Sequence, residues 1–265
     1  MGLDRLIVKK RGDIMSNSSL VDITIKSPNH SGKRTHKIDR ITPHCVVGQL
    51  TAESIGNTFK DSSRKASCNY GIGTKGKIVL CVDEANRSWC SPSSSNDQRA
   101  VTIECASDKT SPYAFNSKVY TTLIDLCVDI CKRNGKTKLL WIPDKDKALS
   151  YTPKKDEMLL TVHRWFANKS CPGDWLFNRM DELASAVTKR LSKSSGNSTT
   201  KSSKKSFKVK VTASTLNVRD GAGTSYGIVT TVKKGEVYTI SETKDNWGKL
   251  KSGAGWIYLD YTKRC

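Results

Sequence analysis

The feature that most constrains this chain is a stretch of fifteen residues that offers nothing to bury. SKSSGNSTTKSSKKS, at residues 192–206, consists only of Ser, Lys, Gly, Asn and Thr. This composition is typical of a flexible, cationic linker, because ordering it would bury almost no apolar surface. We therefore predict two domains, at residues 1–190 and 207–265, joined by a linker at residues 191–206. The first fourteen residues are a possible extension, since Met15 is a second potential start.

The first domain alternates between strand-like and helix-like patterns. Apolar runs predict strands at residues 40–47, 78–82, 100–105 and 138–143. Apolar residues at helical spacing predict helices over 117–135 and 173–193, the second with Asp174 as its N-cap. Interleaved strands and helices indicate an α/β fold with a mixed central sheet flanked by helices.

Two Gly- and Ser-rich segments of this domain are interpreted as connections. GIGTKGK, at 71–77, is predicted to turn between two strands, and it lacks the GKS/T ending of a phosphate-binding loop. SPSSSND, at 91–97, is predicted to be a polar loop, either at the rim of a substrate site or simply solvated.

The tail beyond residue 206 has a different pattern. Short runs rich in Val, Ile, Thr and Tyr are separated by the turn signals RDGAG, KKGE, KDN and SGAG. No helical periodicity is present, so we predict a small all-β barrel.

Charge and cysteine content limit the classes of function. The formal net charge of +20 predicts attraction to a polyanion, which can be nucleic acid, anionic lipid or a phosphate-rich cell wall. The nine cysteines are scattered without any CxxC pair, which favours buried free thiols and a reducing site of synthesis. The stretch MGLDRLIVKKRGDIMSNSS has no apolar core typical of a secretory signal, and no apolar run of membrane-spanning length occurs.

The stretch HRWFANKSCPG raises the question of a metal site. It places His163 and Cys171 eight residues apart before a Pro-Gly stop, while His44 ends an apolar run far upstream. A catalytic zinc ion needs three protein ligands of nitrogen or sulfur type and an open position for water. These three residues fit that need, although each taken alone is more often a core or rim residue.

Four segments occur in the order found in one family of wall-degrading enzymes. TPHCVVG, NYGIGTKGKIVLCVDE, NDQRAVTIECASD and HRWFANKSCPG resemble the type-2 N-acetylmuramoyl-L-alanine amidases, over roughly residues 20–190. These are zinc enzymes that share a fold with peptidoglycan recognition proteins. The tail, through LNVRDGAGTSYGIVTTVKKGE and GWIYLDY, resembles a bacterial SH3-type wall-binding domain.

The resemblance implies roles for particular residues. It makes His44, His163 and Cys171 the Zn²⁺ ligands, Glu104 the catalytic carboxylate and Lys169 the transition-state lysine. It also implies that Tyr70 flanks the metal, although the CNY context departs from the family's usual His-Tyr or Tyr-His pairing.

The two resemblances together imply a phage or prophage endolysin acting on Gram-positive peptidoglycan. Its SH3-like domain would bind the wall, aided by anionic wall polymers. Such an enzyme stays in the host cytoplasm until lysis and then reaches the wall.

Other functions remain open at this point. A bacterial autolysin would have the same activity, and a non-catalytic peptidoglycan receptor would have the same fold. A zinc endopeptidase would share the two-domain layout. A nucleic-acid-binding protein is suggested by charge alone, and no helix-turn-helix or basic–aromatic surface pattern supports it.

Overall fold

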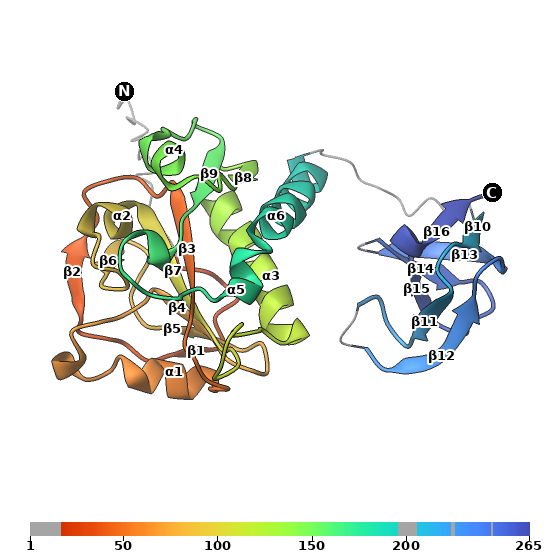
Figure 1. Cartoon of the computed structure of the whole chain (residues 1–265), viewed down its shortest axis with the longest axis horizontal. Coiled ribbons are helices and arrows are strands. Elements are labelled where there is room, and N and C mark those ends of the chain that lie inside the picture. The colour runs from red at the N-terminus through yellow and green to blue at the C-terminus, as the bar shows by residue number, and fades with distance from the viewer. Residues whose placement is uncertain (1–16, 196–205, 224–225, 245) are drawn as a thin grey trace, which may run out of the picture. The chain divides into compact units, whose positions relative to one another are not determined.

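The computed structural model describes residues 17–195, 206–223, 226–244 and 246–265. The chain divides into two compact units, Met1–Gly196 and Asn197–Cys265 (Figure 1). The possible extension at residues 1–14 and most of the expected linker lie outside the described residues. The linker begins later than expected, because helix α6 (Met180–Ser195) continues into the segment that we assigned to it.

A seven-stranded mixed sheet forms the centre of the first unit. Its order is β1-β5-β4-β7-β3-β9-β8, and every neighbouring pair is parallel except β4–β5. The strand bounds, in sheet order, are Ile23–Thr24, Ile78–Leu80, Tyr70–Ile72, Ala100–Cys105, Arg40–Cys45, Glu157–Leu160 and Lys138–Leu140. A separate antiparallel pair joins β2 (His30–Lys33) to β6 (Asn86–Ser88). The expected α/β fold with a mixed sheet is confirmed, as is the turn between β4 and β5.

Helices pack on both faces of this sheet. On one face, α3 (Ser117–Arg133) packs with α6 over a large apolar core, and the two helices lie side by side in Figure 1. On the other face lies α1 (Ala52–Thr58), against β4 and β5. The shorter helices are η1 (Ser62–Arg64), α2 (Ser94–Arg99), α4 (Lys145–Ser150), η2 (His163–Trp165) and α5 (Asp174–Phe177).

The helix expected over 117–135 is confirmed as α3, and its sequence explains it. Its apolar residues recur every three to four positions and are fully buried: Val119, Leu123, Leu126, Ile130 and Cys131. Asn116 caps the first turn, where its Oδ1 accepts a hydrogen bond of 3.0 Å from the Val119 N–H.

The single helix expected over 173–193 is wrong, because two helices occupy this segment. A break at Asn178 and Arg179 separates α5 from α6, and the residue that precedes α5 is Gly173 rather than Asp174. Gly173 has a φ of 85°, and a Cβ there would lie 2.9 Å from the Pro112 carbonyl oxygen. This position therefore requires glycine, which gives the Pro-Gly stop a physical reason.

The polar loop expected at 91–97 is also wrong over its second half, which starts α2. Ser93 caps this helix, since its Oγ accepts a hydrogen bond of 3.2 Å from the Asn96 N–H. Asn96 and Asp97 are completely buried rather than solvated. Asp97 holds the chain before the helix, because its Oδ2 accepts from the N–H groups of Cys90 (3.1 Å) and Ser91 (2.9 Å).

The second unit is built of antiparallel strands, as expected for a small all-β domain. Its sheet order is β12-β11-β15-β14-β13-β10-β16 around one apolar core. The strand bounds from β10 to β16 are Phe207–Val211, Thr215–Arg219, Ile228–Lys233, Val237–Lys244, Trp247–Leu250, Trp256–Tyr258 and Thr262–Arg264, with η3 at Leu259–Tyr261. Within the part of the chain that the structure describes, no helix combines the length and apolarity needed to cross a bilayer.

Candidate functional site

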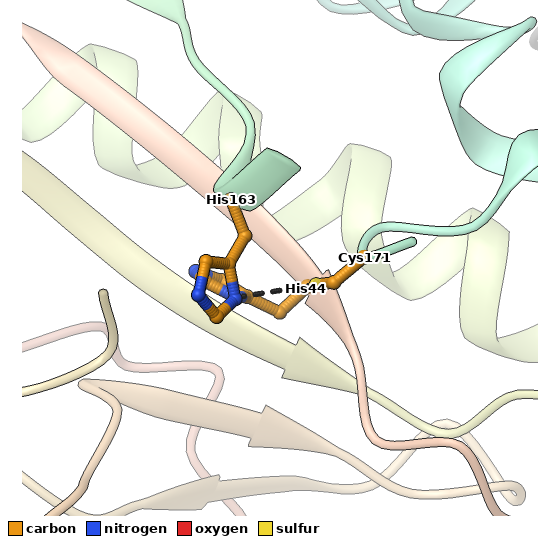
Figure 2. Close-up of side chains that lie close together, drawn as sticks. All are labelled: His44, His163 and Cys171. Carbon is orange, nitrogen blue, oxygen red and sulfur yellow. Dashed lines mark hydrogen bonds between the residues drawn. The ribbon is translucent and has the colours of Figure 1, made fainter. Parts of the chain in front are cut away.

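Three side chains from distant segments converge at one end of the central sheet. His44 lies near the end of β3, His163 opens η2, and Cys171 lies in the loop that follows (Figure 2). One donor atom of each lies within 4.8 Å of the other two. The Cys171 Sγ is 3.3 Å from the His44 Nδ1, and the two imidazole rings are 5.0 Å apart between centroids. The structure thus brings together the three residues expected to bind metal.

The segment from His163 to Cys171 reaches this geometry by folding back on itself. The N–H of Arg164 donates to the carbonyl of Cys171 at 3.0 Å, which ties the two ends of the loop together. The guanidinium of Arg164 also pairs with Asp174 at 2.9 Å. The eight-residue spacing therefore reflects a closed loop whose two ends bring His163 and Cys171 together, and it does not reflect a helical repeat.

The electrostatics of the cluster keep its imidazoles neutral. Burial, reinforced by the neighbouring His163, lowers the pKa of His44 to about 3. Burial and the positive charge of Lys169 lower the pKa of His163 as well. Neutral imidazoles have a free lone pair, which is the form that binds metal.

The donor set fits a zinc ion. The buried Nε2 of His44 has no hydrogen-bond partner among the described groups, so a polar atom inside the protein is left unsatisfied. A hydrogen bond with Cys45 and burial raise the pKa of the Cys171 thiol well above its ordinary value. Two imidazoles and one sulfur are the ligand types that zinc prefers, and a bound cation would favour the thiolate form of Cys171.

Glu104 lies beside this cluster because of strand register. In the parallel pair β3–β7, His44 is the direct partner of Glu104, so both side chains point to the same face of the sheet. A carboxylate oxygen of Glu104 lies within 4.8 Å of a His44 ring nitrogen. Burial raises the pKa of Glu104 to about 7, against the opposing effects of a hydrogen bond from Cys90 and the charge of Arg64. The strand pattern alone would also fit a Glu104 side chain on the protein surface, away from any site. The structure instead places this side chain beside His44.

Lys169 is exposed in the loop between His163 and Cys171. Its charge acts on His163, as the lowered pKa of that imidazole shows.

Tyr70 does not lie at the site, and its expected role there is wrong. In the pair β4–β7 the partner of Glu104 is Gly71, so Tyr70 points to the opposite face of the sheet. Its hydroxyl donates to the Glu84 carboxylate at 2.6 Å and accepts from the Ser18 N–H at 2.9 Å. Glu84 is in turn paired with Arg133, so Tyr70 belongs to a buried ionic network with a structural role.

A cavity of about 250 Å³ adjoins the cluster and contains residues that the sequence did not single out for the site. Apolar side chains from α1 and from the segments before and after it form much of its wall, and Arg64 and Cys90 also line it. Trp89 lines it too. By contrast, Trp141 stacks on Trp165 at 5.1 Å, and Trp175 packs against Phe115.

All nine cysteines are free thiols, and six of them are buried. Only the pattern around Cys171 carried a signal that could set it apart from the others.

Comparison with known proteins adds the family. The model of the family described as N-acetylmuramoyl-L-alanine amidase matches residues 34–174, and the model described as bacterial SH3 domain matches residues 214–263. A search of the curated proteins gave no match.

Solved structures with a similar arrangement share little sequence with this chain. The endolysin N-acetylmuramoyl-L-alanine amidase LysCS from Clostridium intestinale is 15% identical, with 63% of this chain and 97% of that chain covered and a TM-score of 0.42. A mutant endolysin from Bacillus subtilis is 14% identical, with 63% and 99% covered and a TM-score of 0.45. The Staphylococcus aureus hydrolase AmiA, in complex with its ligand, is 11% identical, with 67% and 86% covered and a TM-score of 0.46.

The family match is the finding that decides the identity of this chain. It spans more than half of the sequence and includes His44, His163 and Cys171 as well as Glu104 and Lys169. The chain belongs to the N-acetylmuramoyl-L-alanine amidase family, and it is a hydrolase that cleaves the amide bond between N-acetylmuramic acid and L-alanine in peptidoglycan.

Proposed function

We propose that this amidase depends on zinc, held by His44, His163 and Cys171, and that Glu104 and Lys169 carry out the proton transfer and charge stabilisation. One observation carries the proposal: two neutral imidazoles, a thiol and a partly buried carboxylate converge from four segments on one end of the sheet. When bound, zinc polarises a carbonyl group and makes water more acidic.

Glu104 is the proton carrier in this proposal. Its carboxylate accepts a proton from the attacking water and delivers it to the leaving nitrogen of L-alanine. A pKa of about 7 suits both steps, because the group gives up and takes a proton at similar cost near neutral pH.

Lys169 faces the oxyanion that develops on the scissile carbonyl. We expect Lys169→Ala to lower kcat by roughly 10²–10³-fold, the usual effect of removing one group that stabilises an oxyanion. Zinc content should stay unchanged, since Lys169 binds no metal in this proposal. Lys109→Ala is the matched control, because Lys109 is another exposed lysine of the same unit and its loss changes net charge equally. An equal fall in both variants would assign the effect to general electrostatics.

The activity and its metal requirement are tested on purified Gram-positive peptidoglycan. New N-terminal alanine without new reducing sugar ends, lost on treatment with a zinc chelator and restored by zinc, is the expected result. New amino termini other than alanine would indicate an endopeptidase. Wall binding with no product would indicate a receptor.

We propose that the second unit binds the wall, partly through charge. Residues 197–265 contain thirteen Lys and Arg against five Asp and Glu, which favours anionic wall polymers. We expect wall binding of the whole chain to weaken strongly toward about 1 M salt, where charges are screened beyond about 3 Å. Walls stripped of anionic polymers should bind more weakly at low salt and lose this dependence. Salt-independent binding to both walls would restrict recognition to an uncharged epitope.

We further propose that the enzyme acts as a phage or prophage endolysin on Gram-positive walls. The combination of an amidase match with a bacterial SH3 match supports this role. Produced inside a host with an intact membrane, the enzyme should leave cell density unchanged until the membrane is permeabilised. Lysis without permeabilisation would instead indicate an exported autolysin.

A further inference from the structure

Cys90 contacts the carboxylate that the reaction uses. Its Sγ lies 3.7 Å from the Glu104 Oε1, and it also lies within 4.8 Å of a His44 ring nitrogen. Cys90 and Glu104 both line the cavity beside the cluster. The thiol comes from the segment after β6, so it approaches Glu104 from outside the central sheet.

The two carboxylate oxygens of Glu104 differ in their hydrogen bonding. Among the described groups, the Cys90 thiol is the hydrogen-bond partner of Oε1, whereas the buried Oε2 has none. A protonated thiol is a weak donor, and burial next to the negative charge of Glu104 keeps the pKa of Cys90 well above its ordinary value. The thiol therefore engages one oxygen, while the other is a buried acceptor whose hydrogen-bonding capacity is unused among the described groups.

The position of Cys90 is itself fixed on both sides. Its N–H donates to Asp97 at 3.1 Å, and the same carboxylate holds Ser91. The preceding Trp89 exchanges backbone and side-chain hydrogen bonds with Ser67, each of 2.9 Å. A donor anchored in this way restricts the rotation of the Glu104 carboxylate at little entropic cost.

We propose that Cys90 is a positioning residue of the amidase, whose thiol orients Glu104 so that Oε2 points toward the reacting groups. The inference rests on the proposed role of Glu104. It assigns no metal bond to Cys90, although its sulfur is close enough to His44 for that alternative to be tested.

Kinetics of the full-length zinc enzyme test the inference. We expect Cys90→Ala to lower kcat by roughly fivefold to tenfold, the effect of one lost hydrogen bond, with KM little changed. Cys90→Ser keeps a donor on a shorter bond and should lose less. Cys81→Ala is the matched control, because Cys81 is a fully buried thiol of the same apolar cluster, and its kcat should equal that of the wild type.

A double variant separates positioning from a general structural effect. If Cys90 acts through Glu104, Cys90→Ala should lower kcat no further in an enzyme that already carries Glu104→Gln. An equal loss in both backgrounds, or an unchanged kcat in Cys90→Ala alone, would overturn the inference.

A spectroscopic readout separates positioning from metal binding. In the cobalt-substituted enzyme, the sulfur-to-cobalt absorption should be the same in wild type and Cys90→Ala and absent in Cys171→Ser. A weaker band in Cys90→Ala would make Cys90 a ligand and overturn the inference. If the wild type binds cobalt but cleaves no wall, the proposed function fails first, and the two failures are thereby distinguished.

Discussion

Replacing Cys171 with serine is expected to abolish wall hydrolysis and to remove bound zinc. Serine is close in size to cysteine, so the loop from His163 should keep its fold, including the hydrogen bond from the Arg164 N–H to the residue 171 carbonyl. A hydroxyl is far less acidic than a thiol and remains neutral near pH 7, so the site loses the anionic ligand that zinc favours. Without the metal, the scissile carbonyl is not polarised and activity falls to background.

Zinc content measured on the purified variant checks this expectation alongside activity. Cys265→Ser is the matched control, since Cys265 is an exposed thiol in the second unit, and it should keep both zinc and activity. The melting temperature of zinc-free wild type should match that of Cys171→Ser, because both lack the same ligand-linked stabilisation. Full zinc content with full activity in Cys171→Ser would contradict the assignment of this ligand.

Replacing Glu104 with glutamine is expected to lower kcat by roughly 10²–10⁴-fold, the usual contribution of a general acid–base group. Glutamine has nearly the same shape and can still accept a hydrogen bond from Cys90, but it cannot take a proton at Oε2. Zinc content and KM should therefore stay close to those of the wild type. This pattern differs from that of Cys171→Ser, in which activity and metal are lost together.

The matched control for this second expectation is Glu182→Gln, which removes the same charge from the exposed face of α6. Its kcat should not change. Removing the charge of Glu104 should also leave the melting temperature equal or slightly higher, since desolvation makes this carboxylate costly to ionise. A Glu104→Gln enzyme with wild-type kcat would show that another group moves the proton.

Local patterns in the sequence were sufficient for much of the fold. The spacing of Val119, Leu123 and Leu126 predicted α3, because a helix brings residues three to four apart onto one face. The turn signals of the tail predicted its strands in the same way. These patterns involve residues close together in the chain. Tertiary contacts therefore stabilise the helices and strands that the patterns predict, but they do not determine which type forms.

Two expectations failed where local composition and spacing do not decide the local structure. Asp97 belongs to a helix rather than a loop because it is buried and bonded to Cys90 and Ser91, which the polar composition of 91–97 does not reveal. The helix expected from Gly173 onward is broken at Asn178 and Arg179. The place of Asp97 depends on neighbours that the polar composition does not identify, whereas the hydrogen bonds at the break, from the N–H groups of Asn178 and Arg179 to the carbonyls of Asp174 and Leu176, are local.

The sequence by itself determined the two-part organisation, the α/β and all-β classes, and the residue types of the proposed zinc and proton-transfer sites. Only the tertiary structure decided which of these residues meet. Strand side chains alternate between two faces, so a shift of one residue in register moves a side chain through the sheet. The observed register places Glu104 beside His44 and sends Tyr70 to the opposite face of the sheet, while the loop held by Asp97 brings Cys90 to the carboxylate. Register is set by hydrogen bonds between strands far apart in the chain, and for that reason local sequence patterns could not reveal the place of Tyr70 or the contact of Cys90 with Glu104.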